Sequence, residues 1–275
     1  WFVHEQPRPL CEDHLVMSAA RQREDAGHCM VGPIEIVGAE PGMVLEVELE
    51  DVVPGSWGWS GASQNDRSWG RKLGLDEGSV LSQFWEIDVD DGIARNQFGD
   101  EVRIRPFPGL IGMPPDLPGR HSTIPPRNFG GNLDCRELVA GSRLFLPVSV
   151  PGALLSLGDG HAAQGDGEVS GVAIECPLER VDLRVTLHEH TTIPAPRAIT
   201  PAGRIAFGFH TSLDEAWARA LDNMVLWMMD LYSISRVRAV ALASIGVDLR
   251  VTQVVNQVAG VHALLRENDL SVGHC

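Results

Sequence analysis

Two segments in which apolar and polar residues alternate place the strongest constraint on the fold of this chain. The segment 44–49 reads VLEVEL, and the segment 181–187 reads VDLRVTL. Neighbouring side chains along a β-strand point to opposite faces, so each segment presents one apolar and one polar face. A helix would scatter the same apolar residues around its circumference. The pattern therefore predicts half-buried strands and a chain built mainly from β-sheet.

Other segments show the same preference for extended structure. Residues 34–53 read as two strands around a Glu-Pro-Gly turn, and residues 143–157 and 169–187 read as buried strands that flank a glycine-rich acidic loop. Residues 54–100, which are rich in Gly, Trp and Asp, predict loops and short strands. Seven prolines in the segment 101–130 fix extended loops and exclude a central helix.

Helical signals occur toward the C-terminus. Ser212, followed by Glu215, forms a capping box at the start of a helix predicted over about 213–231. Five residues stack on one face of that helix: Ala216, Ala220, Met224, Trp227 and Met228. A second helix near 235–245 leads into a strand with the sequence DLRVTQVVN. The predicted fold class is mainly β with a C-terminal α+β part.

The charge balance argues against one large class of partners. The 275 residues include 22 Lys and Arg against 37 Asp and Glu, which gives a net charge of -15. A nucleic-acid-binding protein concentrates basic charge on one surface, and no run of Lys or Arg occurs here. We therefore expect no nucleic-acid partner. A hydrophobic fraction of 44% with 21% charged residues is typical of a soluble globular protein.

Cysteine usage and hydropathy indicate the compartment. The five cysteines are odd in number and contain no CxxC pair, which argues against a disulfide framework or a zinc ribbon. No apolar stretch approaches the ~20 residues of a membrane-spanning helix. No signal-peptide pattern opens the chain. We expect a cytoplasmic protein with no membrane partner.

The segment 157–175, with the sequence LGDGHAAQGDGEVSGVAIE, carries the densest chemistry of the chain. It contains four carboxylates and one imidazole on a glycine-rich backbone that can turn tightly: Asp159, His161, Asp166, Glu168 and Glu175. Residues two apart share a face in extended backbone, so Asp159 can point with His161, and Asp166 with Glu168. The two pairs can meet across the intervening turn, which predicts a catalytic or metal-binding loop.

The donor types favour particular ions. Carboxylates with an imidazole suit zinc, manganese or iron, whereas calcium prefers oxygen ligands alone. The DxDxDG pattern of calcium loops is absent, and no GK[ST] follows the glycines as a phosphate-binding loop requires. The alternative interpretation is a hairpin rich in Asx turns with solvated acids.

A second polar group lies upstream, in the sequence IPPRNFGGNLDCREL. Asn132 and Asp134 share strand parity just after a Gly-Gly pair, and Arg127 belongs to the same turn. Asp134 could supply a further metal ligand, and Asn132 could donate to a carbonyl oxygen. The alternative is that both residues cap a turn and a following short helix.

Five blocks of the sequence resemble the acetamidase/formamidase family of amide hydrolases. They include the HCMVGP strand with its GAEPG turn, the middle segments RPFPGLIGMPP and PPRNFGGNLD, and the acidic segment itself. The blocks are 28–52, 105–115, 125–134, 146–175 and 248–265. The resemblance implies a metal-dependent hydrolase that converts small aliphatic amides to the carboxylic acid and ammonia. It also implies a β-sandwich-like core with an appended α+β part.

The resemblance also implies roles for individual residues. It places metal ligands at Asp134, Asp159, His161 and Glu168, and catalytic groups at Glu168, Glu175, Asn132 and His28. Glu168 is the first candidate for the general acid/base, with Glu175 as the alternative. Asn132 or a glycine N–H would stabilise the oxyanion. We expect a divalent metal, zinc in the first place, with manganese, iron and calcium as alternatives.

The expected organisation has three parts. Residues 1–27 match the family poorly and form an atypical N-terminal segment, residues 28–200 a β-rich catalytic core, and residues 201–275 an α+β part packed on that core. The resemblance implies a homo-oligomer, in the first place a dimer. The alternative functions are a non-catalytic metal-binding or small-ligand module, and a hydrolase of another carbon–nitrogen substrate such as a urea or carbamate.

Cysteine is the alternative nucleophile. Cys135 follows Asp134 and Cys176 follows Glu175, so a thiol–carboxylate pair is conceivable. A nitrilase-type amidase also needs a lysine partner, and Lys72 is the sole lysine of the chain, far from either cysteine in sequence. Buried packing is therefore the preferred interpretation of both thiols.

Overall fold

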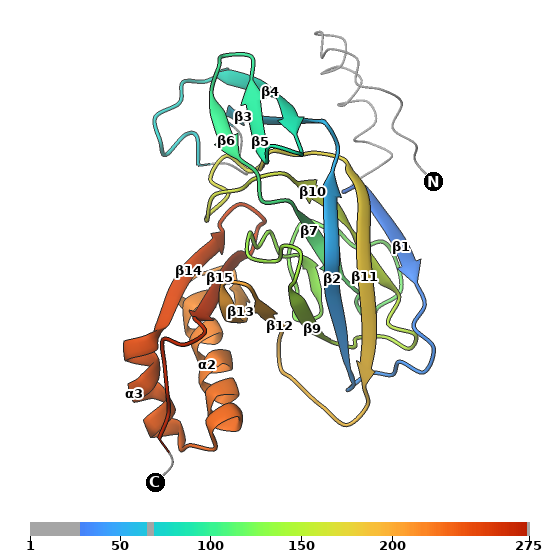
Figure 1. The fold of residues 1–275 in the computed structure, drawn as a ribbon, viewed down its shortest axis with the longest axis vertical. Coiled ribbons are helices and arrows are strands. Elements are labelled where there is room, and N and C mark those ends of the chain that lie inside the picture. Colours follow the sequence, from blue (N-terminus) through green and yellow to red (C-terminus); the bar gives the residue numbers. More distant parts are fainter. Residues whose placement is uncertain (1–27, 65–68, 274–275) are drawn as a thin grey trace.

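A seven-stranded antiparallel sheet is the largest element of the computed structural model, which describes residues 28–64 and 69–273 (Figure 1). The strand order is β11-β2-β9-β12-β13-β15-β14. The strands are β2 (Val44–Pro54), β9 (Arg143–Pro147), β11 (Leu178–His188), β12 (Arg197–Thr200), β13 (Gly203–His210), β14 (Val247–Gln253) and β15 (Ala259–Leu265). The two alternating segments of the sequence pair with each other in β2 and β11, with Val47 opposite Val185.

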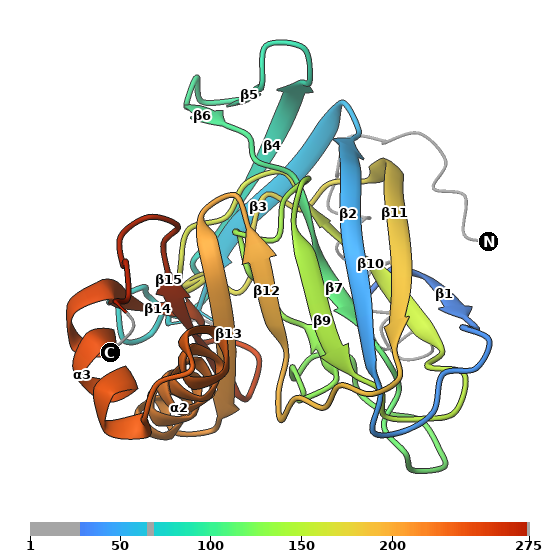
Figure 2. The same ribbon diagram turned by 60° about the horizontal axis from the view of Figure 1, so that its bottom comes forward.

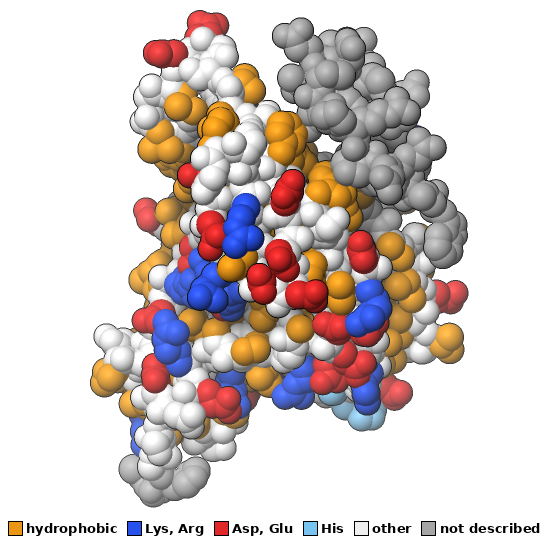
Figure 3. All heavy atoms as spheres, turned by 45° about the horizontal axis from the view of Figure 1, so that its top comes forward, with side chains coloured by type: hydrophobic (Ala, Val, Ile, Leu, Met, Phe, Trp, Pro, Cys, Tyr) orange, Lys and Arg blue, Asp and Glu red, His pale blue; other side chains and the backbone are white. Residues whose placement is uncertain are grey.

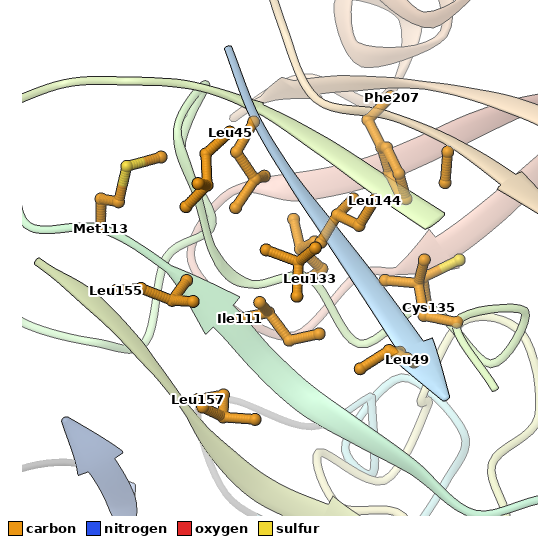
Figure 4. Packing of buried hydrophobic residues seen from close by; sticks show 14 of the residues in the cluster. Leu45, Leu49, Ile111, Met113, Leu133, Cys135, Leu144, Leu155, Leu157 and Phe207 are labelled. Atoms are coloured by element: carbon orange, nitrogen blue, oxygen red, sulfur yellow. The ribbon is translucent and has the colours of Figure 1, made fainter. Parts of the chain in front are cut away.

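A four-stranded antiparallel sheet stacks on the first and completes a β-sandwich. Its order is β1-β10-β7-β8. Its strands are β1 (Met30–Ile34), β7 (Phe107–Gly112), β8 (Gly130–Asn132) and β10 (Leu155–His161). Figure 4 shows the apolar side chains packed in the core, among them Leu45, Leu49, Ile111, Leu144 and Leu155. The predicted mainly β, sandwich-like fold is confirmed.

A third sheet covers one end of the sandwich (Figure 2). It contains β3 (Trp57–Ser63), β4 (Val80–Asp88), β5 (Ile93–Asn96) and β6 (Glu101–Arg103), in that order. The prediction of loops and short strands for residues 54–100 therefore misses that these strands form one sheet. Trp85 and Ile87 of this sheet pack against Ala162 and Ile174, so the sheet lies directly on the acidic segment.

Two helices cover the C-terminal part of the seven-stranded sheet. They are α2 (Leu213–Tyr232) and α3 (Arg236–Gly246), close to their predicted extents. All five residues of the predicted apolar face of α2 are buried against the sheet. Gly208 on β13 permits this contact, because a Cβ there would lie 2.3 Å from the carbonyl oxygen of Ala216. The predicted capping box is wrong: Ser212 makes no side-chain cap hydrogen bond, and Asp214 and Glu215 instead place negative charge at the helix N-terminus.

Several strand boundaries differ from the predictions. β10 runs through His161, so the first part of the acidic segment is strand rather than loop. A turn at 148–154 divides the predicted strand 143–157 into β9 and β10. β11 begins at Leu178 rather than at residue 169, because the preceding residues wrap around the acidic cluster described below. No helix follows Asp134.

The seven-stranded sheet crosses the expected boundary between residues 200 and 201. β12 and β13 are antiparallel neighbours, with Thr200 opposite Gly203. The division into 28–200 and 201–275 stays a prediction. The expected atypical segment 1–27 lies outside the described residues.

The surface mixes charges of both signs. On the face shown in Figure 3, basic and acidic side chains are interspersed. The long pair β2 and β11 illustrates this arrangement, since Arg180 binds Asp51 and Arg184 binds Glu50 across the two strands. Among the described residues, no helix has both the length and the apolar character needed to cross a membrane.

Candidate functional site

Five ionisable side chains meet at the end of β10. They form two groups that share His161: Asp134 with His161 and Glu168, and Asp159 with His161 and Glu175. Within each group the possible ligand atoms all lie within 4.8 Å of one another. β10 supplies Asp159 and His161, the segment after β10 supplies both glutamates, and Asp134 follows β8. All five are residues that the sequence singled out.

Gln164 fixes the orientation of the His161 ring. Its Nε2 donates to the carbonyl oxygen of Asp134 at 2.7 Å, so its Oε1 faces the ring. His161 Nδ1 lies 2.9 Å from that Oε1 and therefore carries a hydrogen. The other nitrogen, Nε2, is directed toward the carboxylates of Asp159 and Glu175. Such a hydrogen bond to the distal nitrogen is the usual way of fixing the tautomer of a metal-binding histidine.

The donor set fits a divalent cation. His161 Nε2 lies 3.3 Å from Glu175 Oε2 and 3.5 Å from Asp159 Oδ2. Ligands at about 2.0–2.1 Å from a tetrahedral zinc ion are about 3.3–3.4 Å apart, so these separations are those of atoms that share one ion. Within the cluster, three buried polar atoms have no hydrogen-bond partner among the described residues: Asp134 Oδ1, His161 Nε2 and Glu168 Oε2. Buried polar atoms are rarely left in this state without a ligand or water.

Backbone strain is concentrated at the same residues. Asp134, Asp159 and Glu168 all have positive φ, at 48°, 58° and 47°. This left-handed region is uncommon for residues other than glycine, although aspartate and asparagine adopt it more often than most. Non-glycine residues in this conformation cluster at functional sites, where the surrounding structure holds them in place.

Gly109 on β7 provides the room for these side chains. It lies between two paired residues of the sandwich, and its carbonyl oxygen accepts the N–H of Asp134 at 3.0 Å. A Cβ at this position would lie 2.7 Å from His161 Cε1, 2.8 Å from Asp134 Oδ1 and 2.9 Å from Asp159 Oδ2. Only glycine therefore allows the three side chains to converge.

We expect Gly109→Ala to lower metal affinity and activity by at least about a hundredfold, because ligands would move by roughly an ångström. Gly273→Ala is the control, since a Cβ there meets nothing within 4 Å and the residue lies outside the cavity wall and the cluster. Metal content after dialysis and the thermal midpoint of both variants would be measured. Full metal occupancy in Gly109→Ala would contradict this account of the glycine.

Burial and mutual repulsion perturb the acids strongly. Burial, reinforced by the neighbouring carboxylates Asp159 and Glu175, raises the pKa of Asp134 to about 7. Burial and the Asp134 carboxylate raise the pKa of Glu168 to about 10. Burial alone would lower the pKa of His161, but the carboxylates of Glu175 and Asp159 raise it well above its usual value. The cluster thus carries an excess of negative charge that protons, or a cation, must balance.

The C-terminal part of the chain supports the cluster from behind. Asn256 Nδ2 donates to Asp134 Oδ2 at 2.5 Å, and Gln253 Oε1 accepts the N–H groups of Val255 and Asn256 to hold that turn. The N–H of Gly167 donates to the carbonyl oxygen of Thr252 at 3.0 Å, which anchors the loop that carries Glu168. These supporting residues were not predicted from the sequence.

A cavity of about 560 Å³ opens beside Glu168. The β3–β6 sheet contributes Ser60, Gln83 and Trp85, and the acidic segment contributes Gln164 and Glu168. Pockets of this size accommodate small-molecule ligands. Trp85 supplies an aromatic side chain to the cavity wall.

The remaining predicted residues lie at different distances from the cluster. His28 Nδ1 is 2.8 Å from Thr123 Oγ1, and its Nε2 is 3.9 Å from Asp159 Oδ2. Asn132 is buried two residues before Asp134, but its Nδ2 donates to the carbonyl oxygen of Ile124. These two residues are not members of either group.

Asp166 does not point with Glu168 into the cluster. Its Oδ2 accepts the Nε–H of Arg250 at 2.6 Å, and Arg250 also binds Glu137 at 2.7 Å. Arg105 binds the other oxygen of Glu137 at 3.1 Å. The prediction that Asp166 points with Glu168 is therefore wrong, because Arg250 on β14 binds Asp166 instead.

The alternative nucleophiles are poorly placed. Cys135 and Cys176 are buried, and Figure 4 shows Cys135 within the sandwich core. Burial raises the pKa of Cys176 to about 12 and that of Cys135 further still, so neither forms a thiolate readily. His262 is buried and its Nδ1 lies 2.8 Å from Thr252 Oγ1, whereas His188 binds Glu46.

The sandwich and the cluster around His161 agree with the fold and the site residues that the sequence resemblance implies. The sequence model of the Acetamidase/Formamidase family matches residues 20–121 and 118–197, which is more than half of the chain. A crystal structure of an acetamidase from Bacillus halodurans is similar, with a TM-score of 0.78 and 30% identity, covering 86% of this chain and 78% of that one. This chain belongs to the acetamidase/formamidase family.

Two further relatives match over shorter spans. The acetamidase of Mycolicibacterium smegmatis is 28% identical over 52% of this chain and 49% of its own length. The formamidase of Methylophilus methylotrophus is 29% identical over 69% of this chain and 61% of its own length. The alignments therefore span about half to three fifths of these relatives.

Proposed function

We propose that this protein hydrolyses small aliphatic amides, of the formamide and acetamide type, to the carboxylate and ammonia. The observation that carries the proposal is the pair of carboxylate groups sharing His161 beside a cavity, in a chain of this family. The names of the relatives, acetamidase and formamidase, support the same substrate class.

Our first assignment of the metal ligands is the group Asp159, His161 and Glu175. The direction of His161 Nε2 and its distances of 3.3 and 3.5 Å to the two carboxylates support this choice. Asp134 and Glu168, which were expected as ligands, form the second group with His161 and could hold a second ion or a proton. Zinc is the first candidate, since it tolerates mixed nitrogen and oxygen donors.

A divalent metal at this group would polarise the amide carbonyl and lower the pKa of a water molecule toward about 7. Glu168 lines the cavity and, with a pKa of about 10, holds a proton at neutral pH. Glu168 is thus suited to deliver that proton to the amide nitrogen, which must be protonated before it can leave. Glu175 remains the alternative acid/base if Glu168 binds metal.

The neighbouring residues have positioning roles in this proposal. His28, held by Thr123, orients the Asp159 carboxylate. Asn132 is a weaker candidate for the donor that stabilises the oxyanion, because its Nδ2 already donates to Ile124. A backbone N–H such as that of Gly165 in the cavity wall is the preferred donor.

The test is removal and replacement of metal. The full chain is dialysed against a strong chelator, and ammonia release from formamide and acetamide is measured before and after single divalent metals are restored. We expect chelation to reduce kcat/KM by at least about a thousandfold, because the metal would supply several kcal/mol of transition-state stabilisation. Zinc is expected to restore activity best.

Undiminished ammonia release from the metal-free protein would eliminate the metal-dependent mechanism. Metal binding with no turnover of either amide would instead favour a non-catalytic module or a urea or carbamate hydrolase. Magnesium serves as the control, because it binds mixed nitrogen sites poorly.

We further propose a cytoplasmic location and a homodimer. The unpaired, buried thiols of Cys135 and Cys176 support a reducing compartment. Exposed apolar side chains on α3, namely Val237, Val240 and Ile245, are a surface that a second copy would bury.

A further inference from the structure

Arginine side chains gather around the cavity beside Glu168. Arg103, Arg105 and Arg136 all line it. The chain as a whole has a net charge of -15 and only 22 Lys and Arg, so three cations around one cavity are a local reversal of charge. Clefts lined by one sign of charge attract ligands of the opposite sign.

The acids near the cavity are already paired or belong to the cluster. Asp166 lines the cavity, and its carboxylate binds Arg250 at 2.5 Å. Glu137 binds Arg250 and Arg105. Glu168, the other acid of the wall, is part of the proposed catalytic cluster.

Arg136 and Arg103 have no acidic partner among the described residues. Arg136 Nε is buried and has no hydrogen-bond partner, and within residues 28–64 and 69–273 neither side chain forms an ion pair. A half-buried arginine without a partner loses hydration, and no hydrogen bond within the protein compensates for that loss. Its planar donors match a carboxylate, which it can bind through two parallel hydrogen bonds.

We propose that the cavity accepts an amide whose far end carries a carboxylate, with Arg136 as the anchor and Arg103 at the rim. The proposal rests on the proposed amidase function and narrows its substrate class. The volume of about 560 Å³ exceeds what a four-atom amide such as acetamide fills. Trp85, Val172 and Ile174 in the wall suit a short methylene spacer between the two polar ends.

The test compares two amides of the same shape. Succinamate carries the carboxylate, and its neutral isostere carries an isopropyl group in the same place. We expect kcat/KM of the metal-loaded full chain to be at least about tenfold higher for succinamate, the effect of a hydrogen bond to a charged group. Arg136→Gln should reduce this ratio by about tenfold or more, and Arg103→Gln by less.

Arg120→Gln is the matched control, because Arg120 is exposed and outside the cavity wall; it should leave the ratio unchanged. Binding of succinate, measured by calorimetry, provides a readout that needs no turnover. Succinate should bind the wild type and lose at least about tenfold in affinity in Arg136→Gln. Arg103→Gln, at the exposed rim, keeps the test decisive if Arg136→Gln does not fold.

The two proposals fail in different ways. Turnover of neutral amides with no preference for succinamate and no succinate binding would overturn the arginine anchor and leave the amidase function intact. Arg136-dependent succinate binding without hydrolysis of any amide would support the anchor and overturn the amidase function. Equal losses for both amides in Arg136→Gln would also overturn the anchor, because they would indicate a general role.

Discussion

Replacing His161 with alanine should abolish metal retention and lower kcat/KM for acetamide by at least roughly a thousandfold. The reason is its position: His161 is the one residue that belongs to both groups of possible ligands. Its removal would leave Asp159 and Glu175 without the nitrogen donor that faces them. Metal content after dialysis and ammonia release would be measured on the same preparation.

His190→Ala is the matched control for this prediction. His190 is exposed in the turn after β11 and lies outside both groups. This variant should change kcat/KM by less than about twofold, because surface substitutions away from a site usually have small effects. His161→Gln, which retains a polar side chain of similar reach, separates loss of the ligand from loss of packing. Metal retention in either His161 variant would contradict the assignment of this ring as the shared ligand.

The sequence predicted the cluster well where the chemistry is local. Asp159 and His161 are two residues apart on an extended backbone, and strand parity brings them to one face. Glu168 and Glu175 follow within the same glycine-rich segment, so tight turns suffice to return them. Asp134 was inferred from its place after the Gly-Gly pair, and β8 delivers it next to Gly109.

The residues that sequence analysis missed are those brought in by distant pairing. Asn256 contacts Asp134 across 122 residues, and Arg250 contacts Asp166 across 84 residues. Both positions depend on β14 joining the seven-stranded sheet at its edge, which no local pattern specifies. Gly109 was missed for another reason: a glycine in a proline-rich stretch reads as a turn residue until its strand is paired. The conformation of one segment can be predicted from its own residues, whereas the pairing of strands that are distant in sequence cannot.

The metal-free protein should lose stability as the pH rises from 6.5 to 8.5, by up to about 2–3 kcal/mol or roughly 5–10 °C in Tm. Burial raises the pKa of Glu168 to about 10, so the folded state keeps a proton that the unfolded chain releases near pH 4.5. The free energy of unfolding therefore falls with pH between these values. The raised pKa of His161 acts in the same direction. Burial lowers the pKa of His262 to about 3, which affects stability only below about pH 6.5.

Saturating metal should remove or reverse this slope. Binding requires deprotonated ligands, so affinity rises with pH and offsets the loss of the proton-stabilised state. Thermal midpoints of the chelated and the metal-loaded protein would be compared across the same range. Glu168→Gln should flatten the slope of the metal-free protein, whereas Glu179→Gln, an exposed glutamate on β11, should leave it unchanged. A metal-free protein whose Tm rises between pH 6.5 and 8.5 would show that the buried carboxyl of Glu168 is already ionised. Glu168 would then have to take a proton from the attacking water before it could deliver one to the leaving nitrogen.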